Sequence, residues 1–250
     1  MSNICRPYLS LIIPAYNESA TILDTLSAVR GYLCGQPWQW EVIVCADGAD
    51  GTRERARDFS SGDSRFQVIG SPARRGKGRG VREGVLGASG DVIGFLDADY
   101  KTPVEELEKL LPWLAGGFDV AIGSRRATGA RVEVAPTLCR RAGSRVFGAM
   151  MRQLMGLPDV RDTQCGFKFF TRPAATTLFS LQQVDGYMFD IEILRLCGLL
   201  DLRVKEVGVR WRDDGDSRYD PIFGTWKNMR ELLRIRKMKY KLSSVASCSI

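Results

Sequence analysis

Short apolar runs alternate with amphipathic stretches along the first half of the chain. The runs are rich in β-branched residues and lie at Leu9–Pro14, Glu41–Cys45, Phe66–Ile69, Val92–Leu96 and Val120–Ile122. After the first run, apolar residues recur at the spacing of one helix face, at Ile22, Leu26, Val29 and Leu33. This alternation of strands and helices predicts an α/β fold with a mostly parallel central sheet and helices on both faces.

The second half of the chain has a less regular pattern. Thr102–Glu105 reads as a capping box with proline at the first helical position. We predict helices at about Leu138–Met155 and Asp190–Leu199, a loop at Gly156–Gly166 and a strand at Leu202–Trp211. The chain is then divided into a domain at 1–220, a basic amphipathic helix at 221–241 and a disordered tail at 242–250.

Two carboxylates follow the strand predicted at Val92–Leu96. Parallel sheets bind ligands at the carboxyl ends of their strands, and residues i and i+2 of an extended segment point the same way. Asp97 and Asp99 should therefore converge. They would repel each other without a cation between them, and carboxylate oxygens suit Mg²⁺ or Mn²⁺. The alternative for so short a pattern is a helix cap beside a solvated side chain.

Residues that could contact a nucleobase or a phosphate follow other strands. Asp47 could accept a hydrogen bond from a nucleobase, whereas a turn and a helix cap explain Asp50 and Thr52. The basic, glycine-rich segment Arg74–Gly80 leads into a helix and could meet a phosphate, although it lacks the P-loop spacing and could be a solvated loop.

A second anion site is a further interpretation of three residues. Arg125 follows the strand at Val120–Ile122, and Arg140 and Ser144 share one helix face. Each of these side chains taken alone is better explained as a solvated surface residue.

The chain contains no histidine, which excludes Ser-His-Asp triads, histidine bases and histidine metal sites. Seven cysteines form no C-x-x-C pair, and Cys165, without a histidine to activate it, is expected to be structural. We expect a cytoplasmic protein, because no signal peptide or run of about 20 apolar residues is found.

The net charge of +7 is concentrated near the C-terminus. Between Thr225 and Lys241, seven cations stand against Glu231, beside an apolar stripe that includes Trp226 and Leu232. Such a helix can lie on the anionic cytoplasmic face of a membrane, or it can pack on the domain with its cations in solvent. No aromatic–basic recognition motif is present, so we expect no nucleic-acid partner.

Read together, these segments form a recognisable order. They are Leu11–Glu18, an Asp-Gly turn at Asp47, Arg75–Gly78, Asp97–Asp99 and Gly123–Arg125. In this order they resemble family 2 inverting glycosyltransferases of the GT-A fold. Asp162–Lys168 and Phe189–Glu192, with Trp211 and Ser217-Arg218, are most similar to the dolichyl-phosphate glucose synthase branch.

The resemblance implies transfer of a hexose from a nucleotide sugar to a polyprenyl phosphate. UDP-glucose is favoured as donor, with GDP-mannose as the alternative. The implied nucleotide pocket consists of Pro14, Tyr16, Glu18, Asp47, Lys77 and Asp97. Asp97 and Asp99 would hold Mg²⁺ or Mn²⁺ and, with Arg125, take part in catalysis; the acceptor phosphate would be bound by Arg125, Arg140, Ser144 and Arg218.

Two departures from the family pattern leave other functions open. Ala46 stands where relatives carry an aspartate, and Lys101 follows the D-x-D pair. We expect the basic helix to replace the N-terminal anchor of eukaryotic glucose synthases. The alternative functions of the chain are transfer to a hydroxyl acceptor, with Asp162 or Asp190 as base, and a non-catalytic role as a module that binds phosphate or membranes. A phosphomonoester needs no such base, because its second pKa is about 6.

Overall fold

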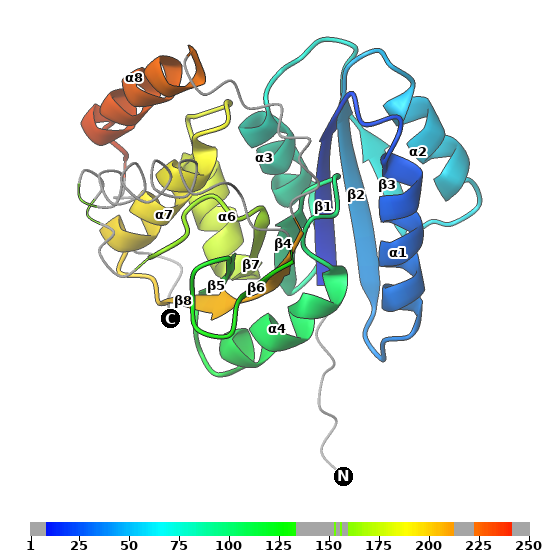
Figure 1. Ribbon diagram of the computed structural model, residues 1–250, viewed down its shortest axis with the longest axis horizontal. Helices are drawn as coiled ribbons and strands as arrows, with labels where there is room; N and C mark the ends of the chain where they lie inside the picture. Colours follow the sequence, from blue (N-terminus) through cyan, green and yellow to red (C-terminus); the bar gives the residue numbers. More distant parts are fainter. Residues whose placement is uncertain (1–8, 134–152, 154–155, 157–159, 213–222, 242–250) are drawn as a thin grey trace.

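The computed structural model describes residues 9–133, 153, 156, 160–212 and 223–241. A seven-stranded sheet in the order β3-β2-β1-β4-β7-β5-β8 runs through the molecule, with a separate pair β6-β9 (Figure 1). The strands are β1 Leu9–Tyr16, β2 Trp40–Asp47, β3 Phe66–Ile69, β4 Val92–Leu96, β5 Val120–Ser124, β6 Arg131–Val132, β7 Phe167–Thr171, β8 Val204–Gly208 and β9 Arg210–Trp211. The helices are α1 Ile22–Cys34, α2 Thr52–Ser60, α3 Lys77–Gly87, η1 Val104–Glu106, α4 Leu107–Ala115, α6 Arg172–Leu181, α7 Phe189–Leu199 and α8 Phe223–Lys237.

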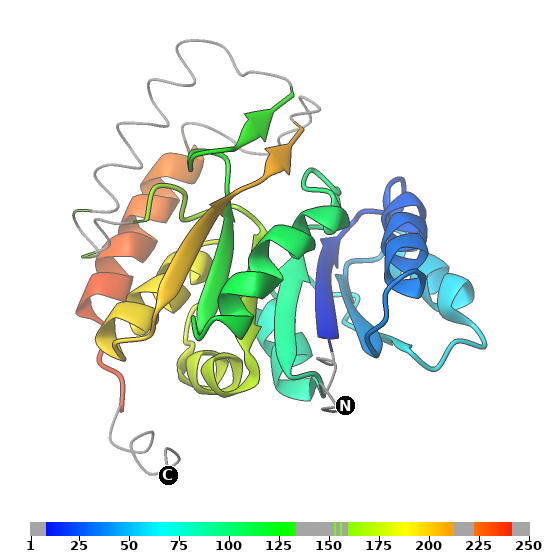
Figure 2. The same cartoon turned by 90° about the horizontal axis from the view of Figure 1, so that it is seen from below.

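Each face of the sheet buries its own hydrophobic core. Leu11 and Ile13 of β1 join a core with side chains of α1, α2 and α4, whereas Ile12 joins a core with α3, α6, α7 and α8. Successive residues of a strand point to opposite faces, so strands covered on both sides are apolar throughout. This explains the continuous apolar runs, and it confirms the prediction of helices on both faces (Figure 2).

One strand in the middle of the sheet was not predicted. β7 pairs antiparallel with both β4 and β5, whereas all other neighbours in the large sheet run parallel. The ring of Phe169 lies against Gly94 of β4, where a Cβ would come within 2.1 Å of the ring. Because β7 runs against β4, its first residue, Phe167, lies opposite Leu96 at the end of β4. The residue before β7 therefore meets the residues that follow β4.

Other predicted elements agree with the structure to different degrees. All five apolar runs are strands, and α7 forms where a helix was predicted. The strand expected at Leu202–Trp211 is divided into β8 and β9. The capping-box prediction was wrong, since η1 follows Pro103 without a side-chain cap from Thr102. The predicted helix at Leu138–Met155 lies largely outside the described residues.

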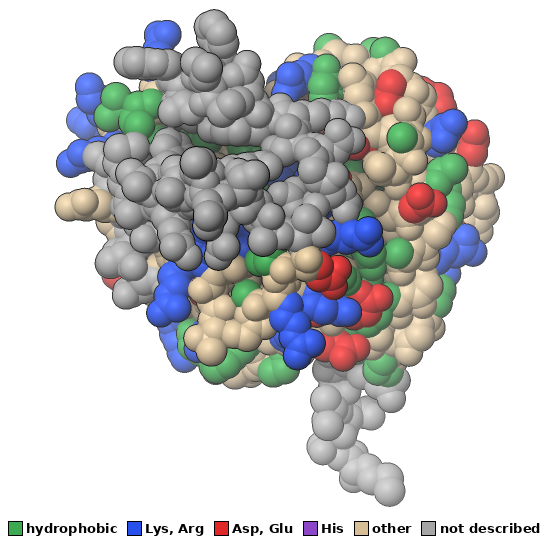
Figure 3. Space-filling view, in the orientation of Figure 1, with side chains coloured by type: hydrophobic (Ala, Val, Ile, Leu, Met, Phe, Trp, Pro, Cys, Tyr) green, Lys and Arg blue, Asp and Glu red, His purple; other side chains and the backbone are tan. Residues whose placement is uncertain are grey.

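The C-terminal helix α8 packs on the domain through its apolar side. Leu232 and Ile235 are fully buried in the core shared with α7, and the Arg195 guanidinium donates to the Ile235 carbonyl at 3.0 Å. Leu233 is exposed among cations, and Figure 3 shows Lys and Arg side chains around an apolar patch where α8 lies in Figure 1. Among the described residues, no helix is long and apolar enough to span a bilayer.

Candidate active site

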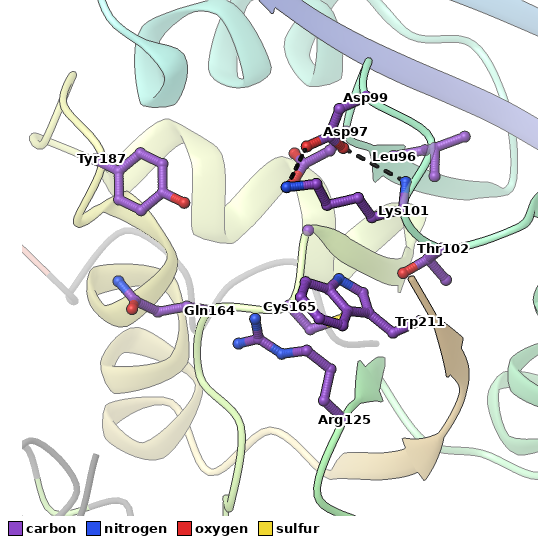
Figure 4. Close-up of a pocket in the computed structure, with 11 residues that line it drawn as sticks. Leu96, Asp97, Asp99, Lys101, Thr102, Arg125, Gln164, Cys165, Tyr187 and Trp211 are labelled. Carbon is purple, nitrogen blue, oxygen red and sulfur yellow. Dashed lines mark hydrogen bonds and ion pairs between the residues drawn. The ribbon is translucent and has the colours of Figure 1, made fainter. Parts of the chain in front are cut away.

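A polar cavity of about 140 Å³ opens at the carboxyl ends of β4 and β5 (Figure 4). Its walls come from segments far apart in the sequence: Leu96, Asp97, Asp99, Lys101, Thr102, Arg125, Gln164, Cys165, Gly166, Tyr187 and Trp211. The structure thus brings Asp97, Asp99 and Arg125 together at the carboxyl ends of β4 and β5, although β7 lies between these two strands. Gln164 and Tyr187 were missed as lining residues, because nothing in the sequence showed that their loops turn back to this edge.

Asp97 is held from two sides. Its backbone N–H donates to the Gly166 carbonyl at 3.2 Å, and its carboxylate lies so close to Gly166 that a Cβ there would be 2.0 Å from Oδ2. On the other side, Lys77 Nζ lies 2.6 Å from Oδ1. Lys77 begins α3, so the basic loop delivers an ammonium group to the carboxylate. Lys77 and Asp97, which were both expected at the donor site, are therefore in direct contact.

The electrostatics around Asp97 and Asp99 favour a cation. Burial and the Asp97 carboxylate raise the pKa of Asp99, whose Oδ2 lies 3.4 Å from Lys101 Nζ. Burial would lower the pKa of Lys77, but Asp97 raises it, so this ammonium is charged. No group of three potential His, Cys, Asp or Glu ligands assembles within the described part of the chain. The carboxylates fit a divalent cation that also takes oxygens from a substrate diphosphate.

Arg125 is fixed at the cavity by Asp162. The guanidinium donates from Nε and from one terminal nitrogen to the two carboxylate oxygens, at 2.7 Å each, and the Arg125 N–H adds a bond of 2.9 Å. Burial opposes ionisation of Asp162, yet these contacts with Arg125 lower its pKa to about 2. The Trp211 ring lies 5.2 Å from the Arg125 guanidinium carbon and 5.9 Å from Lys101 Nζ, between the two cations (Figure 4).

The expected nucleobase contacts lie along the same edge of the sheet. Tyr16 and Asp47 are register partners at the ends of β1 and β2. Both Asp47 oxygens accept hydrogen bonds from the chain itself, from the N–H groups of Ser71 and Arg75 at 3.1 and 2.9 Å and from the Arg75 guanidinium. In this structure Asp47 therefore holds the basic loop. The Arg74 guanidinium carbon lies 4.5 Å from the Tyr16 ring centroid.

The remaining residues expected at the site lie near the end of β1, in the turn after β2, or outside the described residues. Pro14 pairs with Cys45 near the end of β1, and a Glu18 oxygen accepts a hydrogen bond from Thr21 at 3.2 Å. Asp50 accepts from the Thr52 N–H, which agrees with the turn interpretation. The acceptor residues Arg140, Ser144 and Arg218 lie outside the described residues.

A sequence comparison with known families decides the classification. The pattern of glycosyl transferase family 2 matches residues 10–179, more than half of the chain. This chain belongs to glycosyl transferase family 2. Among relatives in this family, the dolichyl-phosphate beta-glucosyltransferase of Drosophila melanogaster is 36% identical over 91% of this chain and 74% of its own length. That of Trichomonas vaginalis is 34% identical over 91% and 70%.

Solved structures of the same architecture confirm the GT-A fold. Glucosyl-3-phosphoglycerate synthase from Mycobacterium tuberculosis, in complex with Mn²⁺, UDP-glucose and phosphoglyceric acid, superposes with a TM-score of 0.67. The alignment covers 96% of this chain and 80% of that one at 20% identity. Similarity at this level of identity shows the fold.

Proposed function

We propose that this family 2 glycosyltransferase moves glucose, with inversion, from UDP-glucose to a polyprenyl phosphate of the dolichyl type. The support comes from relatives at 34% and 36% identity that are dolichyl-phosphate beta-glucosyltransferases. The site agrees with such substrates, since Lys77, Lys101 and Arg125 bring three cations to the edge where anionic phosphates would bind.

One observation supports the choice of acceptor: both aspartates that could act as a general base, Asp162 and Asp190, are already held in ion pairs. Asp162 is bound by Arg125 on both oxygens, and its lowered pKa makes it a weak base. Asp190 is 2% exposed, paired with Lys168, and does not line the cavity. A hydroxyl acceptor needs a base, whereas a phosphomonoester with a second pKa of about 6 arrives ionised. The lipid phosphate therefore fits this chain better than a hydroxyl does.

In this proposal the donor diphosphate binds beside the Lys77–Asp97 ion pair and Asp99. Asp97 and Asp99 would hold Mg²⁺ or Mn²⁺, which stabilises the charge that develops on the leaving diphosphate. The Mn²⁺ and UDP-glucose in the Mycobacterium tuberculosis synthase support this assignment. Pro14, Tyr16, Glu18 and Asp47 are the proposed lining of the nucleotide pocket, at the ends of β1 and β2 and in the loop after β1.

In this proposal the acceptor phosphate binds beside Arg125, which lines the cavity. Arg125 is held rigidly by Asp162 and faces the cavity, so it can orient the phosphate oxygen for in-line attack at the anomeric carbon (Figure 4). Arg140, Ser144 and Arg218 complete the proposed phosphate contacts.

Membrane contact is proposed through the outer side of α8. Its buried side chains hold it on the domain, while Arg230, Leu233, Arg234 and Lys237 are exposed. An apolar residue among cations suits the anionic cytoplasmic face of a membrane, where the lipid acceptor would be found.

The test of this function is transfer from UDP-glucose and, separately, GDP-mannose to a polyprenyl phosphate, with Mg²⁺, Mn²⁺ or a chelator. We expect a chelator-sensitive glucolipid from UDP-glucose, and loss of most turnover in Asp99→Asn with thermal unfolding unchanged. Product from GDP-mannose alone would reassign the donor. Metal-dependent donor hydrolysis without glycolipid would point to another acceptor, and neither product nor hydrolysis would favour the non-catalytic alternative.

A further inference from the structure

The first turn of α7 carries two buried carboxylates whose role the transfer reaction does not explain. Asp190 and Glu192 are 2% and 0% exposed, and neither lines the cavity. They belong to Phe189–Glu192, a segment that contributed to the family resemblance but to which the sequence assigned no physical role. Burying a carboxylate is costly unless hydrogen bonds or a counter-charge compensate, so the partners of these two groups indicate what they hold.

Asp190 holds a fully buried lysine. Lys168 of β7 is 0% exposed, and its Nζ lies 2.5 Å from Asp190 Oδ1. The same ammonium donates to the Cys165 carbonyl at 2.6 Å. The pair therefore fixes the turn that precedes β7 to the start of α7.

This turn is the surface on which Asp97 rests. Gly166 follows Cys165; its carbonyl accepts the Asp97 N–H at 3.2 Å, and its Cα lies against the Asp97 carboxylate. A continuous series of contacts thus runs from Asp190 through Lys168 and the turn to Asp97. A shift of the turn would move the carboxylate that is proposed to face the donor diphosphate.

Glu192 holds the other side of the site. Its oxygens accept the N–H groups of Gln183 and Val184 at 2.9 and 2.8 Å. The side-chain amide of the neighbouring Gln182 donates to the Gly78 carbonyl at 2.9 Å. Gly78 packs so tightly on this loop that a Cβ would lie 2.6 Å from the Val184 carbonyl oxygen. Gly78 follows Lys77, so this loop sets where the Lys77 ammonium lies.

We propose that Asp190 and Glu192 are positioning residues that together fix both partners of the Lys77–Asp97 ion pair. One turn of α7 thereby sets the distance between the cation and the carboxylate that receive the donor diphosphate. This inference rests on the proposed function of the cavity. Residues that orient such groups typically affect activity by about 10- to 100-fold when lost.

The decisive test separates positioning from stability by removing the buried pair in two steps. Asp190→Leu alone leaves an unpaired buried ammonium and should lower Tm. The double variant Asp190→Leu/Lys168→Met removes both charges and should recover most of the Tm, because buried ion pairs can often be replaced by apolar residues. Its kcat should nevertheless stay about 10- to 100-fold below wild type, since the Cys165 carbonyl has lost its donor. Recovery of kcat together with Tm would overturn the inference.

The Glu192 arm has a matched control in Glu41. Glu41 is also a buried carboxylate, 5% exposed, which accepts from the Ser10 hydroxyl and the Ser89 N–H, but it lies at the amino end of β2, away from the cavity. Glu192→Gln should lower kcat by about tenfold, and Glu41→Gln should leave kcat unchanged even if both lower Tm. Equal kcat values for these two variants would contradict the role of Glu192.

Calorimetric titration with UDP in the presence of Mn²⁺ tests the positioning role independently of the proposed acceptor. A wild-type protein that binds UDP but makes no glucolipid would refute the acceptor assignment. The dissociation constants of UDP for wild type and for the double variant would then still test the positioning role. A Kd weakened about tenfold or more in the double variant supports positioning, and an unchanged Kd overturns it.

Discussion

At the scale of single residues, the position of Asp97 depends on the absence of a side chain at Gly166. The φ of Gly166 lies outside the left-handed region, so backbone freedom does not explain the glycine. The explanation is the close approach of the Asp97 carboxylate, 2.0 Å from where a Cβ would stand. Such a requirement is invisible in a sequence, because the two residues are brought together by the antiparallel strand β7.

Gly166→Ala should therefore reduce activity more than stability. The added Cβ would push the Asp97 carboxylate from its place, and misplacement by about 1 Å can cost about 100-fold in rate. The measurements are glucosyl transfer and thermal unfolding. Gly31→Ala is the control: this exposed glycine of α1 has no neighbour near its Cβ, so alanine should stabilise the helix by about 0.5–1 kcal/mol without changing transfer. Normal activity of Gly166→Ala would contradict this account of Asp97.

The Arg125–Asp162 pair should make stability depend on pH in the acid range. The pKa of Asp162 is about 2 in the fold and about 4 in an unfolded chain, so its stabilisation is present above about pH 4 and is lost as pH falls toward 2. A shift of this size corresponds to on the order of 2 kcal/mol.

Denaturant unfolding from pH 7 to pH 3 measures this contribution. Wild type should lose more free energy of unfolding over this range than Asp162→Asn, which has no carboxylate to protonate. Identical pH dependence in the two proteins would show that Arg125 does not hold Asp162 ionised.

At the scale of elements, the sequence predicted those strands and helices whose burial makes a simple pattern. Four of the strands that read as apolar runs, β1, β2, β4 and β5, are buried along almost their whole length. β7 was missed because its buried Lys168 interrupts the aromatic run, and pairing direction leaves no signature in a single strand. Lys168 is a poor residue for a central strand, and its presence is explained by Asp190 and the Cys165 carbonyl.

The two interpretations of the C-terminal helix can be tested separately, because its buried core residues and its exposed cations lie on different sides. Deletion of α8 would remove the core residues Leu232 and Ile235, so charge substitutions are the better test. Replacing exposed Arg230, Arg234 and Lys237 by glutamine should weaken binding to anionic liposomes, by about 1 kcal/mol for each cation that lies near the membrane surface. Thermal unfolding should be unchanged, and unaltered liposome binding would contradict membrane contact through α8.

At the scale of the whole molecule, the order of motifs along the chain predicted the fold and the meeting of Asp97, Asp99 and Arg125. It did so because parallel strands place their carboxyl ends at one edge of a sheet. It did not predict that Asp47 would be engaged by Ser71 and Arg75, since these contacts depend on how a loop folds back. Nor could it show that both candidate bases are buried in ion pairs.

The central claim is that the nucleophile arrives ionised and needs no base from the protein. The measurement that tests it most directly is glucosyl transfer from UDP-glucose to a polyprenyl phosphate and to the polyprenol of equal chain length, followed across pH. We predict transfer to the phosphate alone, with a rate that rises as pH increases through about 6, where the phosphate takes its second charge. Comparable transfer to the alcohol would contradict the account, since it would require a base that neither Asp162 nor Asp190 is placed to supply.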